Sequence, residues 1–261
     1  MQGDSATATV PGFSVVVPVR NEAAAIPGLA AEIAAACAAA GLAWEAVWVD
    51  DGSSDGSRAL LAALPAPHRL IALVRGCGQS AALMAGVRHA RGEWVGLLDG
   101  DGQNDPADLP RQLAHAHAGG WDLVNGIRAR RRDSWPRRLA SVIANRVRDA
   151  VTGDRVTDVG CATRVVRRAA LRQLPLFDGL HRYLPTLVRA QGFRVAEIPV
   201  GHRPRQGGLS KYGINDRLWR GLRDLLGVRW LLARRCVWQV EQDEGAPTAG
   251  ALEAPPAPVV R

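Results

Sequence analysis

The chain has 261 residues, 47% of them hydrophobic, and a formal net charge of +8 from 33 Lys and Arg against 25 Asp and Glu. This composition excludes an intrinsically disordered chain, because it is enough to bury a sizeable core in one large domain with appendages. Lys211 is the sole lysine, so arginine carries the positive charge and favours nucleotides, lipid phosphates or a membrane surface as partners, although a codon bias toward arginine accounts for part of the excess.

The first half of the chain alternates between extended and helical patterns. Residues 13–19, 44–49, 70–74 and 94–98 are predicted strands, and residues 22–40, 55–64 and 79–91 are predicted helices. Such a βαβ rhythm predicts an α/β fold with a mostly parallel sheet flanked by helices.

The second half continues with a predicted helix over 106–119 and a short strand over 122–125. An arginine-rich run follows at 128–138, then a predicted helix over 136–151 and extended segments over 157–166 and 194–200. We expect this half to close a site. Domain boundaries are expected at a flexible N-terminus (1–11), a catalytic domain (12–212), an amphipathic helix (213–238) and a disordered tail rich in Gly, Ala and Pro (239–261).

The cellular compartment is indicated by what the sequence lacks. No cysteine pair has zinc-site spacing, residues 1–12 do not resemble a signal peptide, and no run of about 18 apolar residues predicts a spanning helix. We expect a cytoplasmic protein that does not cross the membrane. The helix over 216–235 interleaves Trp and Leu with Arg, which fits either an interfacial membrane helix or a helix packed on the domain with a wet basic face.

The most informative motif is Asp99-Gly100-Asp101, which ends the predicted strand over 94–98 and precedes Gln103. In extended backbone, side chains at i and i+2 point to the same side, so the two carboxylates converge on one point. Mg²⁺ and Mn²⁺ prefer oxygen ligands and often bind one or two carboxylates together with substrate phosphates. The motif therefore predicts a diphosphate-metal site, with an ordinary solvated turn as the alternative.

Two further polar segments follow predicted strands, at 18–22 and 50–56. The carboxyl ends of parallel strands share one edge, so these segments and the Asp-Gly-Asp motif should gather in one crevice, with Asp55 capping a helix instead. No Gly-rich dinucleotide or P-loop motif is present, which argues against those two nucleotide-binding modes.

At this point the chain resembles glycosyltransferase family two, with its GT-A nucleotide-sugar fold, in the polyprenol-phosphate (dolichol-phosphate mannose synthase-like) branch. The resemblance covers about residues 12–235. The matching motifs are Pro-Val-Arg-Asn-Glu, Val-Asp-Asp-Gly-Ser-Ser-Asp-Gly, Leu-Asp-Gly-Asp-Gly-Gln-Asn-Asp-Pro, Asn-Gly-Ile-Arg, Thr-Asp-Val-Gly-Cys and Glu-Ile-Pro-Val followed by Ser-Lys-Tyr.

The resemblance implies roles for individual residues. The base and ribose pocket would be Pro18, Arg20, Glu22, Val49 and Asp51. The metal ligands would be Asp99, Asp101 and Gln103, with the Gly100 backbone beside the diphosphate. Arg128, Arg205 and Lys211 match cations that meet the diphosphate or the lipid phosphate, and together with Asp101 they are the expected catalytic residues; Arg138 would help to bind the acceptor phosphate.

The implied reaction is a divalent-metal-dependent, inverting transfer from a UDP- or GDP-sugar to polyprenyl phosphate at the inner face of the cytoplasmic membrane, with Mg²⁺ or Mn²⁺ as cofactor and no nucleic acid partner. The alternatives are transfer to a saccharide hydroxyl, or a catalytically silent membrane-binding partner. Relatives often have an aromatic residue at Arg20 and an Ala at Gly100, the second being a minor expected change. His181, Arg182, His202 and Arg203 are further candidates for substrate contact, although a lone His is more often a packed or surface residue.

Overall fold

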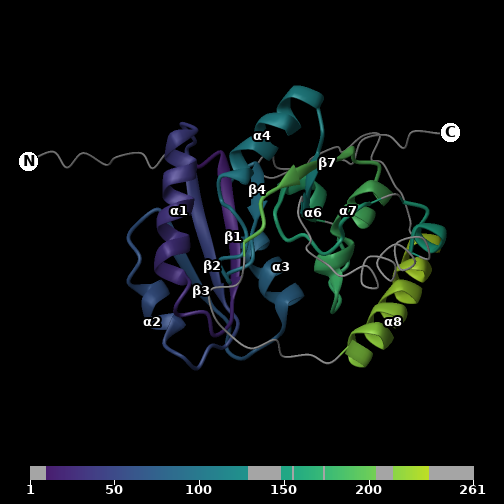
Figure 1. Cartoon of the computed structure of the whole chain (residues 1–261), viewed down its shortest axis with the longest axis horizontal. Helices are drawn as coiled ribbons and strands as arrows, with labels where there is room; N and C mark the ends of the chain where they lie inside the picture. The colour runs from purple at the N-terminus through teal and green to yellow at the C-terminus, as the bar shows by residue number, and fades with distance from the viewer. Residues whose placement is uncertain (1–9, 129–147, 155, 173, 204–213, 235–261) are drawn as a thin grey trace, which may run out of the picture.

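The structure is a computed structural model that describes residues 10–128, 148–154, 156–172, 174–203 and 214–234. Within these residues a seven-stranded sheet is covered by helices on both faces (Figure 1). The strands are β1 (Phe13–Val19), β2 (Trp44–Asp50), β3 (His68–Ala72), β4 (Trp94–Leu97), β5 (Leu123–Arg128), β6 (Arg164–Arg167) and β7 (Val195–Val200). The helices are α1 (Ile26–Ala39), α2 (Ser57–Ala62), α3 (Gln79–His89), α4 (Asp108–Gly119), α6 (Arg168–Arg172), α7 (Leu180–Ala190) and α8 (Ile214–Ala233).

The strand order is β3-β2-β1-β4-β6-β5-β7. All neighbouring strands are parallel except β6, which runs antiparallel to both β4 and β5. The predicted α/β fold with a mostly parallel sheet is confirmed. The carboxyl ends of β2, β1 and β4, which lie next to one another, therefore meet at one edge.

The core has one layer on each face of the sheet. Successive side chains of β1 point to opposite faces, so Val16 packs toward α3 and α7 while Val15 and Val17 pack toward α1 and α4. Every residue of β1 is buried, as expected for a central strand covered on both faces, and each such valine stabilises the fold by about 1.5–3 kcal/mol.

Within the described ranges most element bounds lie one to three residues from the predicted ones, and two differ by more. The first helix begins at Ile26, not at residue 22, and a proline occupies its first turn. The extended segment predicted over 157–166 is a strand only from Arg164. The preceding residues form a turn in which the Asp158 carboxylate accepts the Gly160 N–H, which removes that amide from any strand ladder.

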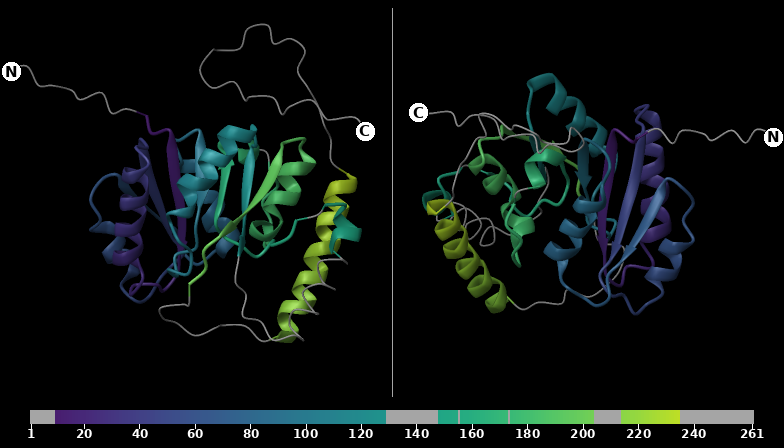
Figure 2. Two further views of the ribbon diagram at one scale, coloured as in Figure 1. Left: turned by 45° about the horizontal axis from the view of Figure 1, so that its top comes forward. Right: turned by 180° about the vertical axis from the view of Figure 1, so that it is seen from behind.

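Helix α8 lies at the opposite end of the molecule from α1 and α2 (Figures 1 and 2). Leu225 and Val228 on this helix are buried, whereas Leu226 and Trp230 are each 58% exposed. None of the helices in the described ranges has the length and apolar content needed to span a bilayer.

Candidate functional site

A cavity of about 270 Å³ opens at the carboxyl ends of β1, β2 and β4. It brings together seven residues that the sequence predicts for the site, namely Pro18, Arg20, Glu22, Asp51, Asp99, Gly100 and Asp101; Val19, Gly78, Gln79 and Ala82 complete its lining. The shared edge of the parallel strands explains why segments so far apart in the sequence meet here.

Asp51 follows β2 and is only 4% exposed. Its carboxylate accepts the backbone N–H of Cys77 at 2.6 Å and that of Gly78 at 3.0 Å, and the Arg20 guanidinium lies 3.8 Å away. Asp51 therefore faces the cavity and also holds the backbone immediately before α3 in place.

The neighbouring carboxylates Asp50 and Asp55 do not line this cavity. Asp50 is fully buried and bonds the Ser53 N–H and Arg58, and these bonds outweigh the opposing effect of burial and lower the pKa of Asp50. Asp55 accepts the N–H and hydroxyl of Ser57, the first residue of α2, but the N-cap of this helix is Gly56, so the predicted capping by Asp55 is wrong. Both residues shape the loop that presents Asp51.

The Asp-Gly-Asp motif lies on the floor of the cavity. Burial, followed by repulsion from Asp101, raises the pKa of Asp99 to about 6, so a cation at this point would relieve an unfavourable pair of charges. No group of three or more His, Cys, Asp or Glu side chains able to hold a metal was found in the described part of the chain. Two carboxylate donors with open space beside them fit an Mg²⁺ or Mn²⁺ ion whose other ligands are water and substrate phosphates.

This cavity is not lined by three predicted site residues of the described ranges, Val49, Gln103 and Arg128. Val49 is fully buried in the core between β2 and α3, and neither cavity described here includes it. The side chain of Gln103 donates to the Arg203 carbonyl at 3.4 Å, and its backbone N–H donates to Asp101. Gln103 thus supports the motif in this structure without lining the cavity.

A second cavity of about 170 Å³ meets the first at Gln79 and Asp99. Its polar wall includes Arg164, His181 and Arg182, and its apolar wall includes Leu83, Leu97 and Val159. Burial, followed by the charges of Arg182 and Arg164, lowers the pKa of His181 to about 4, so this imidazole is neutral at pH 7. Sequence reasoning gave His181 and Arg182 little weight, since nothing in their spacing marks them.

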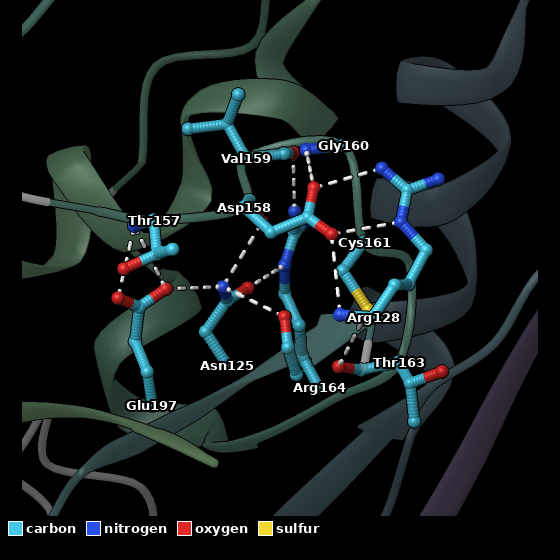
Figure 3. Close-up of polar contacts among 11 residues, drawn as sticks. Asn125, Arg128, Thr157, Asp158, Val159, Gly160, Cys161, Thr163, Arg164 and Glu197 are labelled. Carbon is cyan, nitrogen blue, oxygen red and sulfur yellow. Dashed lines mark hydrogen bonds and ion pairs between the residues drawn. The ribbon is translucent and has the colours of Figure 1, made fainter. Parts of the chain in front are cut away.

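Arg164 was not predicted as a site residue, because it is the first residue of the short strand β6 and belongs to no recognisable motif. It is 3% exposed and donates to Asn125 Oδ1 and to the Val159 carbonyl (Figure 3). It also donates to the His181 carbonyl, so all three acceptors are neutral. Burial lowers the pKa of this guanidinium, and the negative charge of Asp99 opposes that effect. Arg164 therefore places a buried positive charge near Asp99 of the Asp-Gly-Asp motif.

Arg128 ends β5, where its guanidinium faces Asp158 (Figure 3). Their hydrogen bond is the main cause of the raised pKa of Arg128, and the charge of Asp99 also contributes. Asp158 is a second residue that sequence reasoning did not assign to the site. Its loop is held further by Glu197, which accepts the Thr157 N–H, and by Asn125, which donates to the Asp158 carbonyl.

The predicted phosphate-binding residues Arg138, Arg205 and Lys211 lie outside the described residues. Arg203, the last described residue before position 205, donates its N–H to the Gln103 carbonyl at 2.8 Å. The Arg203 guanidinium also pairs with Glu32 of α1 and with Asp105. Residue 203 is thereby anchored beside the Asp-Gly-Asp loop.

Comparison with known sequences gives a family match. The family model described as "Glycosyl transferase family 2" matches residues 14–174. A dodecaprenyl-phosphate galacturonate synthase from Rhizobium johnstonii is 35% identical over 227 residues, which cover 84% of this chain and 67% of the relative. An undecaprenyl-phosphate 4-deoxy-4-formamido-L-arabinose transferase from Edwardsiella ictaluri is 40% identical over 210 residues, which cover 79% of this chain and 64% of the relative. The chain thus spans about two thirds of the length of these curated relatives.

Comparison with solved structures supports the fold. A mannosyltransferase from Pyrobaculum calidifontis in complex with GDP-Man and Mn²⁺ matches with a TM-score of 0.60 at 21% identity, covering 88% of this chain and 66% of the other. A glucosyl-3-phosphoglycerate synthase from Mycobacterium tuberculosis in complex with Mn²⁺ and UDP-glucose matches with a TM-score of 0.64 at 20% identity, covering 85% and 78%. The sheet and its helices are those of GT-A glycosyltransferases.

Proposed function

The chain belongs to glycosyltransferase family 2, and we propose that it transfers a sugar from a UDP- or GDP-sugar to polyprenyl phosphate with inversion at the anomeric carbon. The observation that carries the proposal is the convergence of Asp51, Asp99 and Asp101 in one cavity that continues into a second, cationic one. The names of two relatives, a dodecaprenyl-phosphate galacturonate synthase and an undecaprenyl-phosphate arabinose-derivative transferase, support the acceptor class.

The two cavities support a position for each part of the donor. The nucleoside would occupy the first cavity beside Arg20 and Asp51, and the diphosphate would lie over Asp99 and Asp101. The sugar would then enter the second cavity, since the two cavities meet at Asp99. Two solved structures of this fold, in complex with Mn²⁺ and a nucleotide sugar, support a divalent cation at this point.

Asp99 and Asp101 would hold an Mg²⁺ or Mn²⁺ ion. Such an ion stabilises the negative charge that develops on the departing nucleoside diphosphate. The residues of the chain orient the reactants: Arg164 adds a buried positive charge beside the diphosphate, and neutral His181 is a hydrogen-bonding group for the sugar.

The acceptor phosphate would meet Arg128 at the end of β5. The described bonds of this guanidinium to Asp158 use Nε and Nη2, which leaves Nη1 for a phosphate oxygen. A phosphate monoester is already anionic at pH 7 and needs no strong general base. A sugar hydroxyl would need one, but Asp99 is the sole carboxylate lining the second cavity in the described structure, which favours the phosphate acceptor.

Access to a lipid acceptor would come through α8. The exposed pair Leu226 and Trp230 lies one helical turn apart, with the exposed Arg223 and Arg234 on the same stripe. An apolar strip flanked by arginine suits the interface of an anionic membrane, and a peripheral place on the inner face of the cytoplasmic membrane fits it.

The test is a donor panel. Purified protein is incubated with polyprenyl phosphate, Mg²⁺ or Mn²⁺ and a series of UDP- and GDP-sugars, and products are identified by mass spectrometry. We expect one polyprenyl-phosphate sugar that disappears when the metal is chelated. A product that appears only with a saccharide acceptor, or none with any donor, would refute the proposal.

A further inference from the structure

Gln79, the first residue of α3, contacts a predicted metal ligand. Its side-chain amide Nε2 donates to Asp99 Oδ1 at 2.8 Å. An ionised carboxylate only accepts hydrogen bonds, so the amide nitrogen, and not the amide oxygen, must face Asp99 when Asp99 binds a cation. Gln79 also lines both cavities at the point where they meet.

The backbone that carries Gln79 is fixed from two sides. On one side, Asp51 accepts the N–H groups of Cys77 and Gly78, the two residues that precede it. On the other side, the buried hydroxyl of Ser80 accepts the Gly179 N–H and is hydrogen-bonded to His181. The position of the Gln79 amide is therefore set by the same groups that line the two cavities.

We propose that Gln79 is a positioning residue that holds the Asp99 carboxylate in the orientation needed to bind the divalent cation. This inference rests on the proposed metal site at Asp99 and Asp101. Carboxylates that bind metals are themselves held by hydrogen bonds, and removing such a partner typically weakens metal binding about 10–100-fold. Because the Gln79 side chain is exposed, we expect the lower end of that range.

The same contact links the two halves of the donor site. Asp51, on the nucleoside side, fixes residues 77 and 78, and the next residue bonds the carboxylate on the diphosphate side. A three-residue segment thus joins groups that follow β2 and β4. Gln79 thus connects the fixed backbone of residues 77 and 78 to the Asp99 carboxylate, and it is not itself a metal ligand.

The test is the variant Gln79→Met, which keeps the length of the side chain and removes the donor. Mn²⁺ binding to the full chain is measured by electron paramagnetic resonance with UDP or GDP present. We expect the Kd for Mn²⁺ to rise about tenfold, the thermal unfolding midpoint to stay unchanged, and turnover to return at high Mn²⁺. Arg88→Ala, an exposed change in the last turn of the same helix, is the matched control and should leave the Kd unchanged.

The outcomes separate this inference from the proposed function. An unchanged Kd in Gln79→Met, while wild-type protein binds Mn²⁺, refutes the role of Gln79 and leaves the transferase proposal standing. If the Kd for Mn²⁺ rises in Gln79→Met but wild-type protein yields no glycolipid, the role of Gln79 is supported and the proposed reaction is contradicted. If wild-type protein binds no Mn²⁺ with either nucleotide, the metal site and the role of Gln79 are both refuted.

Discussion

Arg128 and Asp158 are joined by two parallel hydrogen bonds, Nε to Oδ2 and Nη2 to Oδ1, each 2.8 Å long. The side chains are 16% and 10% exposed, so solvent screens this pair far less than a surface ion pair. The pair joins the end of β5 to the loop before β6. It uses the Nε and Nη2 edge of the guanidinium, so the proposed contact of Arg128 with a phosphate would be made by Nη1.

Asp158→Asn should lower both stability and activity. The change replaces a charged acceptor by a neutral amide and leaves a nearly buried guanidinium without its partner, which costs about 1.5–3 kcal/mol. Urea unfolding gives the stability, and the glycolipid assay gives the activity. Arg111→Ala is the control. The Arg111 side chain, which pairs with Asp108, is 61% exposed, so its loss should lower the free energy of unfolding by less than about 1 kcal/mol. Equal losses in the two variants would contradict a special role for the Arg128 pair.

Asp101→Ala should abolish metal-dependent turnover while the fold stays intact. Loss of one of the two carboxylate donors should reduce kcat/KM at least about 100-fold, because the cation supplies several kcal/mol of charge stabilisation. Activity is measured across a titration of Mg²⁺ and Mn²⁺, and circular dichroism checks the fold. Unchanged activity would contradict the metal assignment.

Gly100→Ala should destabilise the site, contrary to the expectation from the family resemblance that Ala here is a minor change. A Cβ at Gly100 would lie 2.9 Å from the Pro18 carbonyl oxygen and 2.9 Å from Val19 Cγ2, so the end of β1 must shift. Overpacking of this kind costs about 1–3 kcal/mol. Gly28→Ala is the control, since its Cβ meets nothing within 4 Å and the change should stabilise α1 by about 0.5–1 kcal/mol. The free energies of unfolding of both variants decide the matter.

His181 should make stability fall on mild acidification. Its pKa is about 4 in the folded chain and near 6.5 when unfolded, so between these values the unfolded chain binds the extra proton. The contribution is complete above about pH 6.5 and is lost as the pH falls toward 4, roughly 1–2 kcal/mol between pH 7 and 5. His181→Gln should flatten this part of the stability profile, whereas His115→Gln on the exposed face of α4 should not. Parallel profiles for all three proteins would exclude His181 as the source.

Replacing Leu226 and Trp230 by Ser should weaken binding to anionic vesicles by at least about tenfold, because it removes the exposed apolar strip and keeps the arginines. Vesicle sedimentation measures the binding. Leu60→Ser, an exposed leucine on α2 at the far end of the molecule, is the control. Equal binding of wild type and double variant would favour the alternative of a packed helix with a wet basic face.

The sequence was sufficient for the sheet and for the nucleotide side of the site because both depend on local patterns. Apolar runs followed by polar turns mark β1, β2 and β4, and strand parallelism then brings Asp51, Asp99 and Asp101 together. Val49 shows the limit of motif matching. It lies inside β2, so its side chain is packed in the core, whereas Asp51 lies just past the end of the strand and lines the cavity.

The second cavity could not be predicted in the same way. Arg164, His181 and Asp158 come from segments whose pairing depends on tertiary contacts, and the antiparallel direction of β6 has no signature in its four residues. The partner of Arg128 is 30 residues away in the sequence, and the partner of Gln79 is 20 away. The hydrogen bonds of Arg128 to Asp158 and of Gln79 to Asp99 are therefore visible only in the folded structure.

The reversed direction of β6 gives the molecule a modular construction. A strand that runs against its neighbours begins at the edge where they end, so the 157–163 loop reaches that edge from a segment that carries none of Asp51, Asp99 and Asp101. Positions of this loop outside the Asp158 contacts can therefore vary while the Asp-Gly-Asp strand keeps its register. Because Val159 to Ala162 line the second cavity, changes in this loop would alter the sugar and acceptor sides of the proposed reaction together.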